Sequence, residues 1–133
     1  MRRDFSFGDE DANYLEASGL QWETLLVCGV RWLLLHEFPV TEGYVQRTVT
    51  LAVRIEPGYP TAPLDMAYFF PALALCSGRS IPATQAIQDI EGKGFQRWSR
   101  HRTAQNPWRP GIDCLSTHVG QISEWLLAET RRA

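Results

Sequence analysis

Residues 44–71, YVQRTVTLAVRIEPGYPTAPLDMAYFFP, decide the predicted fold, because they place a strand, a proline-rich loop and a second strand in succession. In the first part, apolar side chains alternate with polar ones at Val49, Leu51, Val53 and Ile55. A period of two is typical of a strand with one buried face. Each proline in residues 56–65 disfavours the helical conformation for the residue before it, so we expect an extended loop there. Residues 66–71 then supply another strand.

Two more strands are predicted upstream of this stretch, and one helix is predicted near each end of the chain. Residues 22–29 and 31–38 are rich in strand-forming side chains and are expected to pair antiparallel. Residues 8–19 begin with acidic side chains, which suit a first helical turn, and end at Gly19. Residues 111–130 repeat apolar side chains at helical spacing, at Leu115, Val119, Ile122 and Leu126.

Together these elements predict one α+β domain over residues 1–133. Its parts are an N-terminal helix, a four-stranded antiparallel meander, a long irregular segment over residues 72–109 and a C-terminal helix that covers the sheet. One helical turn is expected in residues 83–92, and Cys28 is expected in the core because it alternates with strand residues.

The composition excludes several classes of protein. With 44% hydrophobic and 21% charged residues the chain is typical of a soluble globular protein. The longest apolar run, residues 25–38, contains Arg31 and is too short to span a membrane. Residues 1–14 lack the apolar core of a secretory signal, so we expect a cytoplasmic protein. A net charge of -2 argues against a nucleic-acid partner.

Three motifs rich in proline stand at fixed places among the predicted elements: Tyr59-Pro60, Pro63 and Trp108-Arg109-Pro110. The first two follow the third strand, and the last precedes the C-terminal helix. In this order, over roughly residues 23–127, the chain resembles the ubiquitin-conjugating-enzyme fold. The resemblance implies that Trp108 anchors the irregular segment to the body of the protein.

Residues 59–73, 95–102 and 107–119 together are similar to a bacterial branch of that superfamily, whose members are encoded beside ubiquitin-like proteins, an activating enzyme and a deconjugating peptidase. The resemblance implies a transferase that takes a ubiquitin-like protein from the activating enzyme and passes it to a target amine without a cofactor. It also implies a docking surface for the activating enzyme on the N-terminal helix, including Asp9, Tyr14 and Leu15. The operon resemblance suggests antiphage defence.

Two departures from the family pattern bear on the mechanism. The family's His-Pro-Asn is missing, and no cysteine lies between residues 80 and 110. Ser99 stands nine residues before Trp108, at about the place where the family keeps its cysteine. The resemblance therefore implies Ser99 as the acyl acceptor, with an oxyester in place of a thioester.

A serine hydroxyl is a weak nucleophile at neutral pH and needs a neighbouring base. In an extended chain His101 would share a face with Ser99, and we expect it to be this base. Positive charge for a tetrahedral oxyanion is expected from Arg97, Arg100 and Arg102. Gln96 and Asn106 are neutral alternatives for the same task.

Other interpretations stay open. Cys76 is an alternative nucleophile if the long segment folds back, and the lost cysteine also fits an inactive scaffold that binds a ubiquitin-like protein. Trp98 and Trp108 are either core anchors or stacking platforms in a small domain that binds single-stranded nucleic acid. Cys114 and His118 have metal-ligand spacing on a helix, but they lack a second pair, so we predict no metal site.

Overall fold

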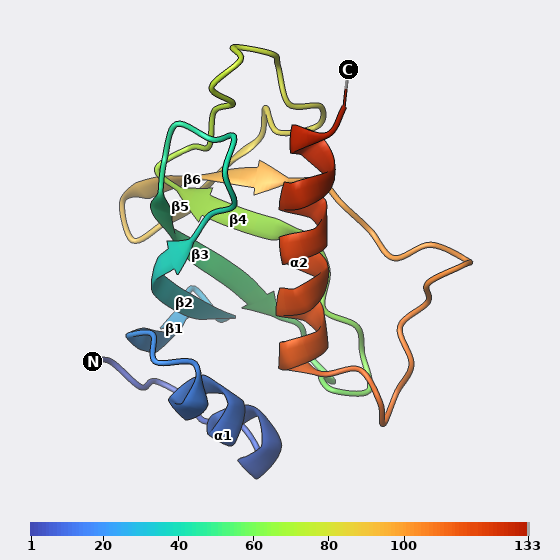
Figure 1. Cartoon of the computed structure of the whole chain (residues 1–133). Coiled ribbons are helices and arrows are strands. Elements are labelled where there is room, and N and C mark those ends of the chain that lie inside the picture. The colour runs from blue at the N-terminus through green and yellow to red at the C-terminus, as the bar shows by residue number, and fades with distance from the viewer. Residues whose placement is uncertain (133) are drawn as a thin grey trace.

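The computed structural model describes residues 1–132 and contains two helices and six strands. In chain order they are α1 (Asp9–Ala17), β1 (Trp22–Val27), β2 (Val30–Pro39), β3 (Thr48–Ile55), β4 (Ala67–Phe70), β5 (Ile87–Ile90), β6 (Lys93–Trp98) and α2 (Leu115–Thr130). The strands form one antiparallel sheet in the order β1-β2-β3-β4-β6-β5. Helix α2 lies along one side of this sheet, and α1 lies near its lower edge (Figure 1).

The predicted stripe on α2 is confirmed, because all four apolar residues of the stripe are buried against the sheet. On the sheet side they meet inward-facing residues of β2 and β3, among them Leu33, Leu51 and Val53, which have no exposed surface. The alternation predicted for residues 49–55 therefore marks the core face of β3. Neither α2 nor any other helix within residues 1–132 has the length and apolar character that a membrane span requires.

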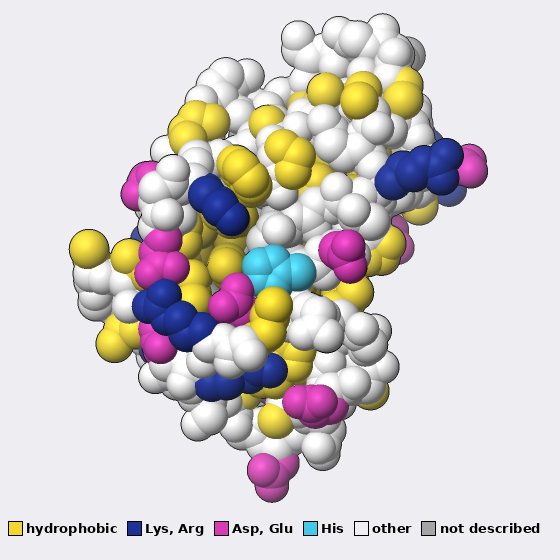
Figure 2. All heavy atoms as spheres, turned by 90° about the vertical axis from the view of Figure 1, so that its left-hand side faces the viewer, with side chains coloured by type: hydrophobic (Ala, Val, Ile, Leu, Met, Phe, Trp, Pro, Cys, Tyr) yellow, Lys and Arg dark blue, Asp and Glu magenta, His cyan; other side chains and the backbone are white. Residues whose placement is uncertain are grey.

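A second, smaller cluster of buried side chains lies on the other face of the sheet, where Trp32 on β2 packs edge-on against Tyr68 on β4 at 5.0 Å between ring centroids. Leu34 on β2 and Phe95 on β6 also belong to this cluster, which therefore extends over the four neighbouring strands β2, β3, β4 and β6. Figure 2, which views the molecule from the left of Figure 1, shows apolar side chains in a hollow surrounded by charged ones.

The sheet differs from the predicted four-stranded meander. Residues 87–98, expected to be irregular with a helical turn, form the β5–β6 hairpin, and β6 pairs with β4. The turn consists of Glu91 and Gly92, with φ values of 50° and 86°. Two successive residues with positive φ match the twist of antiparallel strands and fix a tight hairpin. The four residues of β5 are too few to show the alternation of apolar and polar side chains by which a strand is predicted from sequence.

Cys28 is not in the core, so that prediction is wrong. The residue is exposed and lies with Gly29 in the turn between β1 and β2, where their φ values are 50° and 78°. The register continues to Val27 and Val30, which pair directly across the turn. Gly29 favours a two-residue turn at this position. Cys28 is the first residue of that turn, so it lies outside both strands.

Candidate functional site

Ser99 follows the last residue of β6 and is only partly exposed. Its backbone N–H donates to the carbonyl oxygen of Ala83 at 3.0 Å, which continues the ladder between the two chain segments beyond β5 and β6. The Ser99 hydroxyl itself makes no hydrogen bond to any residue from 1 to 132. Its backbone is thus fixed while its side chain stays available.

His101 is oriented by a carboxylate that sequence reasoning did not assign to the site. Its Nδ1 lies 2.8 Å from Oδ2 of Asp65, and the two side chains are 62% and 34% exposed. The backbone holds the pair in place, because the N–H of Met66 donates to the carbonyl oxygen of Arg100 at 3.1 Å. With Nδ1 occupied, Nε2 is the ring nitrogen that remains for proton transfer. The predicted contact between His101 and Ser99 is replaced here by the one with Asp65.

A shallow groove of about 510 Å³ lies beside this pair. Its walls are the proline-rich loop, including Pro57 and Pro63, and the start of the segment after β6, including His101 and Arg102. The only sequence signal for Asp65 was its place after Pro63, which gave no indication of a partner thirty-six residues away.

Two of the predicted arginines are engaged with carboxylates on or near α2. Arg100 lies 3.2 Å from Oε1 of Glu129 and 4.9 Å above the ring of Trp98, and it also donates to the carbonyl oxygen of Pro82. Arg102 lies 3.8 Å from Asp113. These guanidinium groups hold the segment after β6 against the helix, which leaves less of their charge for chemistry at Ser99.

Arg97 differs from the other two. It pairs with Tyr68 of β4 and precedes the core residue Trp98, so its side chain points to the face of the sheet away from α2. Its Nε is buried without a hydrogen-bond partner, and its guanidinium forms no ion pair with residues 1–132. Ser99, two residues further along extended chain, shares that face. Of the three arginines predicted to stabilise the oxyanion, Arg97 is therefore the one whose charge is not paired with a carboxylate of residues 1–132.

The neutral alternatives have other partners. Gln96 is buried, and its Oε1 accepts hydrogen bonds from the Leu73 N–H and from Nε1 of Trp98 at 2.9 and 3.0 Å. Asn106 lies in the exposed part of the loop and donates to Gln121 on α2 at 2.6 Å. Both amides therefore support the local structure.

Three of the predicted anchoring residues, Tyr59, Pro60 and Trp108, meet at the proline-rich loop. Nε1 of Trp108 donates to the carbonyl oxygen of Pro60 at 3.1 Å, and its ring lies 6.3 Å from that of Tyr59. Pro110 is exposed in the turn before α2. Trp98 has no exposed surface, so its interpretation as a stacking platform for nucleic-acid bases is wrong.

The predicted docking residues on α1 differ in accessibility. Asp9 is exposed at the first turn and Tyr14 is partly buried, but Leu15 has no exposed surface. Leu15 packs into the main core because it lies on the inner face of α1, so it does not belong to a docking surface in this structure.

Cys76 and Cys114 lie in different surroundings. Cys76 is exposed, and its backbone N–H donates to Gly43 at 2.8 Å. Cys114 is buried at the start of α2, with its sulfur 3.7 Å from Oε1 of Glu10. His118, one turn further, places Nε2 3.0 Å from the carbonyl oxygen of Met66, and burial lowers the pKa of His118 to about 4. Cys114 and His118 therefore have separate partners.

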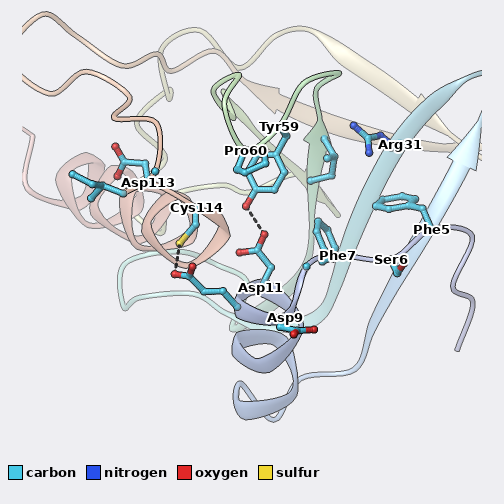
Figure 3. A pocket seen from close by; sticks show the side chains of 15 residues that line it. Phe5, Ser6, Phe7, Asp9, Asp11, Arg31, Tyr59, Pro60, Asp113 and Cys114 are labelled. Carbon is cyan, nitrogen blue, oxygen red and sulfur yellow. Dashed lines mark hydrogen bonds between the residues drawn. The ribbon is translucent and has the colours of Figure 1, made fainter.

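A cavity of about 320 Å³, called the α1 pocket below, lies where the N-terminal segment, α1, the proline-rich loop and the start of α2 meet (Figure 3). Aromatic and acidic side chains dominate its lining, with Phe5, Phe7, Asp9, Glu10, Asp11 and Tyr59 among them. Sequence reasoning missed this cavity, because its lining comes from segments about 100 residues apart.

Comparison with known protein families gives a match over most of the chain. Residues 7–129 match the family described as prokaryotic E2 family E, which covers most of the chain. No curated protein and no solved structure matches the chain.

Proposed function

The chain belongs to prokaryotic E2 family E, and from this membership we propose that it conjugates a ubiquitin-like protein, with Ser99 as the acyl acceptor. An E2-like role calls for two protein partners, a ubiquitin-like protein and its activating enzyme. The observation that carries the assignment to Ser99 is a hydroxyl without a hydrogen-bond partner in residues 1–132, two residues from a histidine that Asp65 orients. Carboxylate-oriented histidine is the usual arrangement for activating a weak hydroxyl nucleophile.

The proposed reaction has two acyl transfers. Ser99 Oγ attacks the carbonyl carbon of the thioester that joins the ubiquitin-like protein to the activating enzyme, while His101 Nε2 accepts the hydroxyl proton. The C–S bond breaks, and the leaving thiolate takes up that proton. A target amine then attacks the oxyester, the C–O bond breaks, and Ser99 regains a proton from the amine. An oxyester is less reactive toward amines than a thioester, so the site must supply more stabilisation of the oxyanion.

Arg97 is the proposed source of that stabilisation. Its guanidinium has no carboxylate partner among residues 1–132 and lies on the same face as Ser99, whereas Arg100 already binds Glu129 and Pro82. A fixed positive charge directed at a developing oxyanion lowers the barrier for both acyl transfers. Arg100, which sequence analysis placed in the same role, is more simply a support for the segment that carries Ser99 and His101.

The test is to mix the protein with the activating enzyme and ubiquitin-like protein encoded beside it, add ATP and measure intact mass. We expect an adduct that survives thiol and is cleaved by hydroxylamine. Ser99→Ala should abolish it, Ser99→Cys should turn it into a thiol-sensitive adduct, and Cys76→Ala should leave it unchanged. A thiol-sensitive adduct of the wild type that disappears in Cys76→Ala would assign the acyl group to Cys76 instead.

The roles of His101 and Asp65 separate in the same assay. His101→Gln should slow adduct formation by about 100-fold or more, since a general base typically contributes about 10²- to 10⁴-fold. Asp65→Asn keeps a side chain of similar size but removes the charge, so its effect should be smaller and should appear in the rate rather than in the final yield. Equal rates in wild type and His101→Gln would contradict the assignment.

A second function, that of an inactive scaffold for a ubiquitin-like protein, rests on one observation. The hydrogen bond of His101 goes to Asp65, and none joins His101 to Ser99 within residues 1–132. In that case the wild type and Ser99→Ala would bind the ubiquitin-like protein equally and neither would form an adduct.

A further inference from the structure

The α1 pocket is separate from the segment that carries Ser99, and its charges are not balanced. Four carboxylate groups line it, those of Asp9, Glu10, Asp11 and Asp113, against one cation, Arg31. Arg31 donates to the carbonyl oxygen of Glu56 and lies over Phe5, away from α1 (Figure 3). Of the four carboxylates, Asp113 alone forms ion pairs with residues that the structure describes, namely Arg102 and Arg109. The pocket is thus negatively charged on its α1 side.

Asp11 is the decisive side chain. It is 8% exposed, and its two oxygens accept hydrogen bonds from the hydroxyl of Tyr59 at 2.6 Å and from the N–H of Leu115 at 3.3 Å. Burial and the hydrogen bond to Asp11 raise the pKa of Tyr59, which keeps the phenol protonated as the donor. No cation among residues 1–132 pairs with Asp11. A buried carboxylate normally has such a partner, because an unpaired buried charge is costly.

The walls of the pocket suit a cation with an apolar stem. The rings of Phe5 and Phe7 lie 5.5 Å apart, and those of Phe7 and Tyr59 lie 6.5 Å apart, each pair edge to face. Aromatic rings attract guanidinium and ammonium groups and also cover the methylene groups that carry them. Ile112, at the rim, is 60% exposed and offers an apolar contact to neighbouring residues of a bound protein.

We propose that the α1 pocket receives an arginine or lysine side chain from a partner protein. The cationic group lies at Asp11 and Glu10, its stem lies against Phe7 and Tyr59, and the flanking residues of the partner contact Ile112. This inference goes beyond the acyl transfer proposed for Ser99, since it concerns recognition at a pocket that Ser99 and His101 do not line, and it requires no reaction.

The test uses three tripeptides as probes: acetyl-Ala-Arg-Ala-amide, the same peptide with lysine, and the same peptide with citrulline, which has the shape of arginine without its charge. Each is titrated into the ¹⁵N-labelled full-length protein and followed by NMR. We expect at least one of the two cationic peptides to shift the amide signals of Phe7, Tyr59 and Ile112 and to bind more tightly than the citrulline peptide, by about tenfold.

Variants show whether the pocket carboxylates are responsible. Asp9→Asn with Glu10→Gln should weaken binding of the cationic peptide by about tenfold, and Asp11→Asn should do the same without removing the hydrogen-bond acceptor for Tyr59. Glu16→Gln, an exposed position of α1 outside the pocket, is the matched control and should bind as the wild type does. If the double variant Asp9→Asn with Glu10→Gln melts at the same temperature as the wild type, its fold is intact. The double variant then tests the proposal even if Asp11→Asn is unstable.

Equal binding of the three tripeptides, or shifts that persist in the double variant, would overturn the proposal, as would the absence of any shift at these amides. The titration needs neither the activating enzyme nor Ser99. A failure of acyl transfer and a failure of this pocket are therefore separate results.

Discussion

At the scale of single residues, strand alternation divides the arginines of residues 97–102 between two faces. Arg100 reaches Glu129 on α2, whereas Arg97 lies on the other face and pairs with no carboxylate in the described part of the chain, residues 1–132. The sequence places three positive charges beside Ser99 but does not distinguish them. The distinction depends on β6 being a strand whose successive residues face opposite sides of the sheet: Trp98 packs in the main core beside α2, whereas Phe95 packs in the smaller cluster on the other face.

His118 makes stability depend on pH. Its pKa in the folded protein is about 4, because burial disfavours the charged form, whereas the unfolded chain has the ordinary value near 6.5. The unfolded chain therefore binds more protons between these values, so folding loses stability as the pH falls through this window. At pH 5 the loss relative to pH 7 should be about 2 kcal/mol from His118 alone.

Urea unfolding at pH 7 and pH 5 measures this term. The free energy of unfolding should differ between pH 7 and pH 5 by about 2 kcal/mol less in His118→Gln than in the wild type. His36→Gln, a partly exposed histidine paired with Glu23, is the control that should retain the His118 term. An equal pH difference in the wild type and in His118→Gln would contradict the assignment to burial.

At the scale of elements, glycines have opposite roles in the β5–β6 hairpin and in α2. Gly92 has a φ of 86° in the hairpin turn, which an alanine adopts only with strain. Gly120 lies within α2 on an exposed position, and an added Cβ would meet no atom within 4 Å. Gly92→Ala should therefore lower the free energy of unfolding by about 1 kcal/mol, and Gly120→Ala should raise it by about 0.5–1 kcal/mol.

Chemical denaturation of both variants beside the wild type checks this pair of predictions. Gly8→Ala is a further comparison, because alanine adopts the φ of -65° found at Gly8 without strain and its added Cβ would meet no atom within 4 Å. A stabilising Gly92→Ala would mean that the turn has another conformation and that β5 is paired differently.

At the scale of the whole molecule, Glu129 joins segments that are distant in sequence. This residue of α2 is 4% exposed, and its carboxylate lies 3.1 Å from Arg79 and 3.2 Å from Arg100. The two arginines belong to the segments before β5 and after β6. One buried carboxylate thus connects the C-terminal helix with the segment that carries Ser99.

Removal of this carboxylate should loosen both segments. Glu129→Ala leaves two partly buried guanidinium groups without their partner, so the free energy of unfolding should fall by about 2 kcal/mol. Glu124→Ala, on the exposed side of the same helix, should change it by less than about 0.5 kcal/mol. Hydrogen exchange should also become faster at the amides of Ser99 and Arg97, which bond to Ala83 and Ala86. Unchanged exchange at these amides would show that Glu129 does not hold the segment.

The sequence by itself determined the two helices, the strands up to residue 70 and the family, because these depend on local periodicity and on the order of short motifs. It also directed attention to Ser99 and His101. The sequence did not predict β5 and β6, because such short strands carry little periodicity. It also did not show that Leu15 lies on the buried face of α1 rather than on its exposed face.

Only the tertiary structure decided which side chains meet. The contact of His101 with Asp65, the separate surroundings of Arg97 and Arg100, and the α1 pocket all join residues far apart in the chain. Such contacts follow from strand pairing and from the packing of helices on the sheet. Periodicity reports how a side chain is oriented within its own element, whereas the partner of that side chain depends on elements that pack against it from elsewhere in the chain.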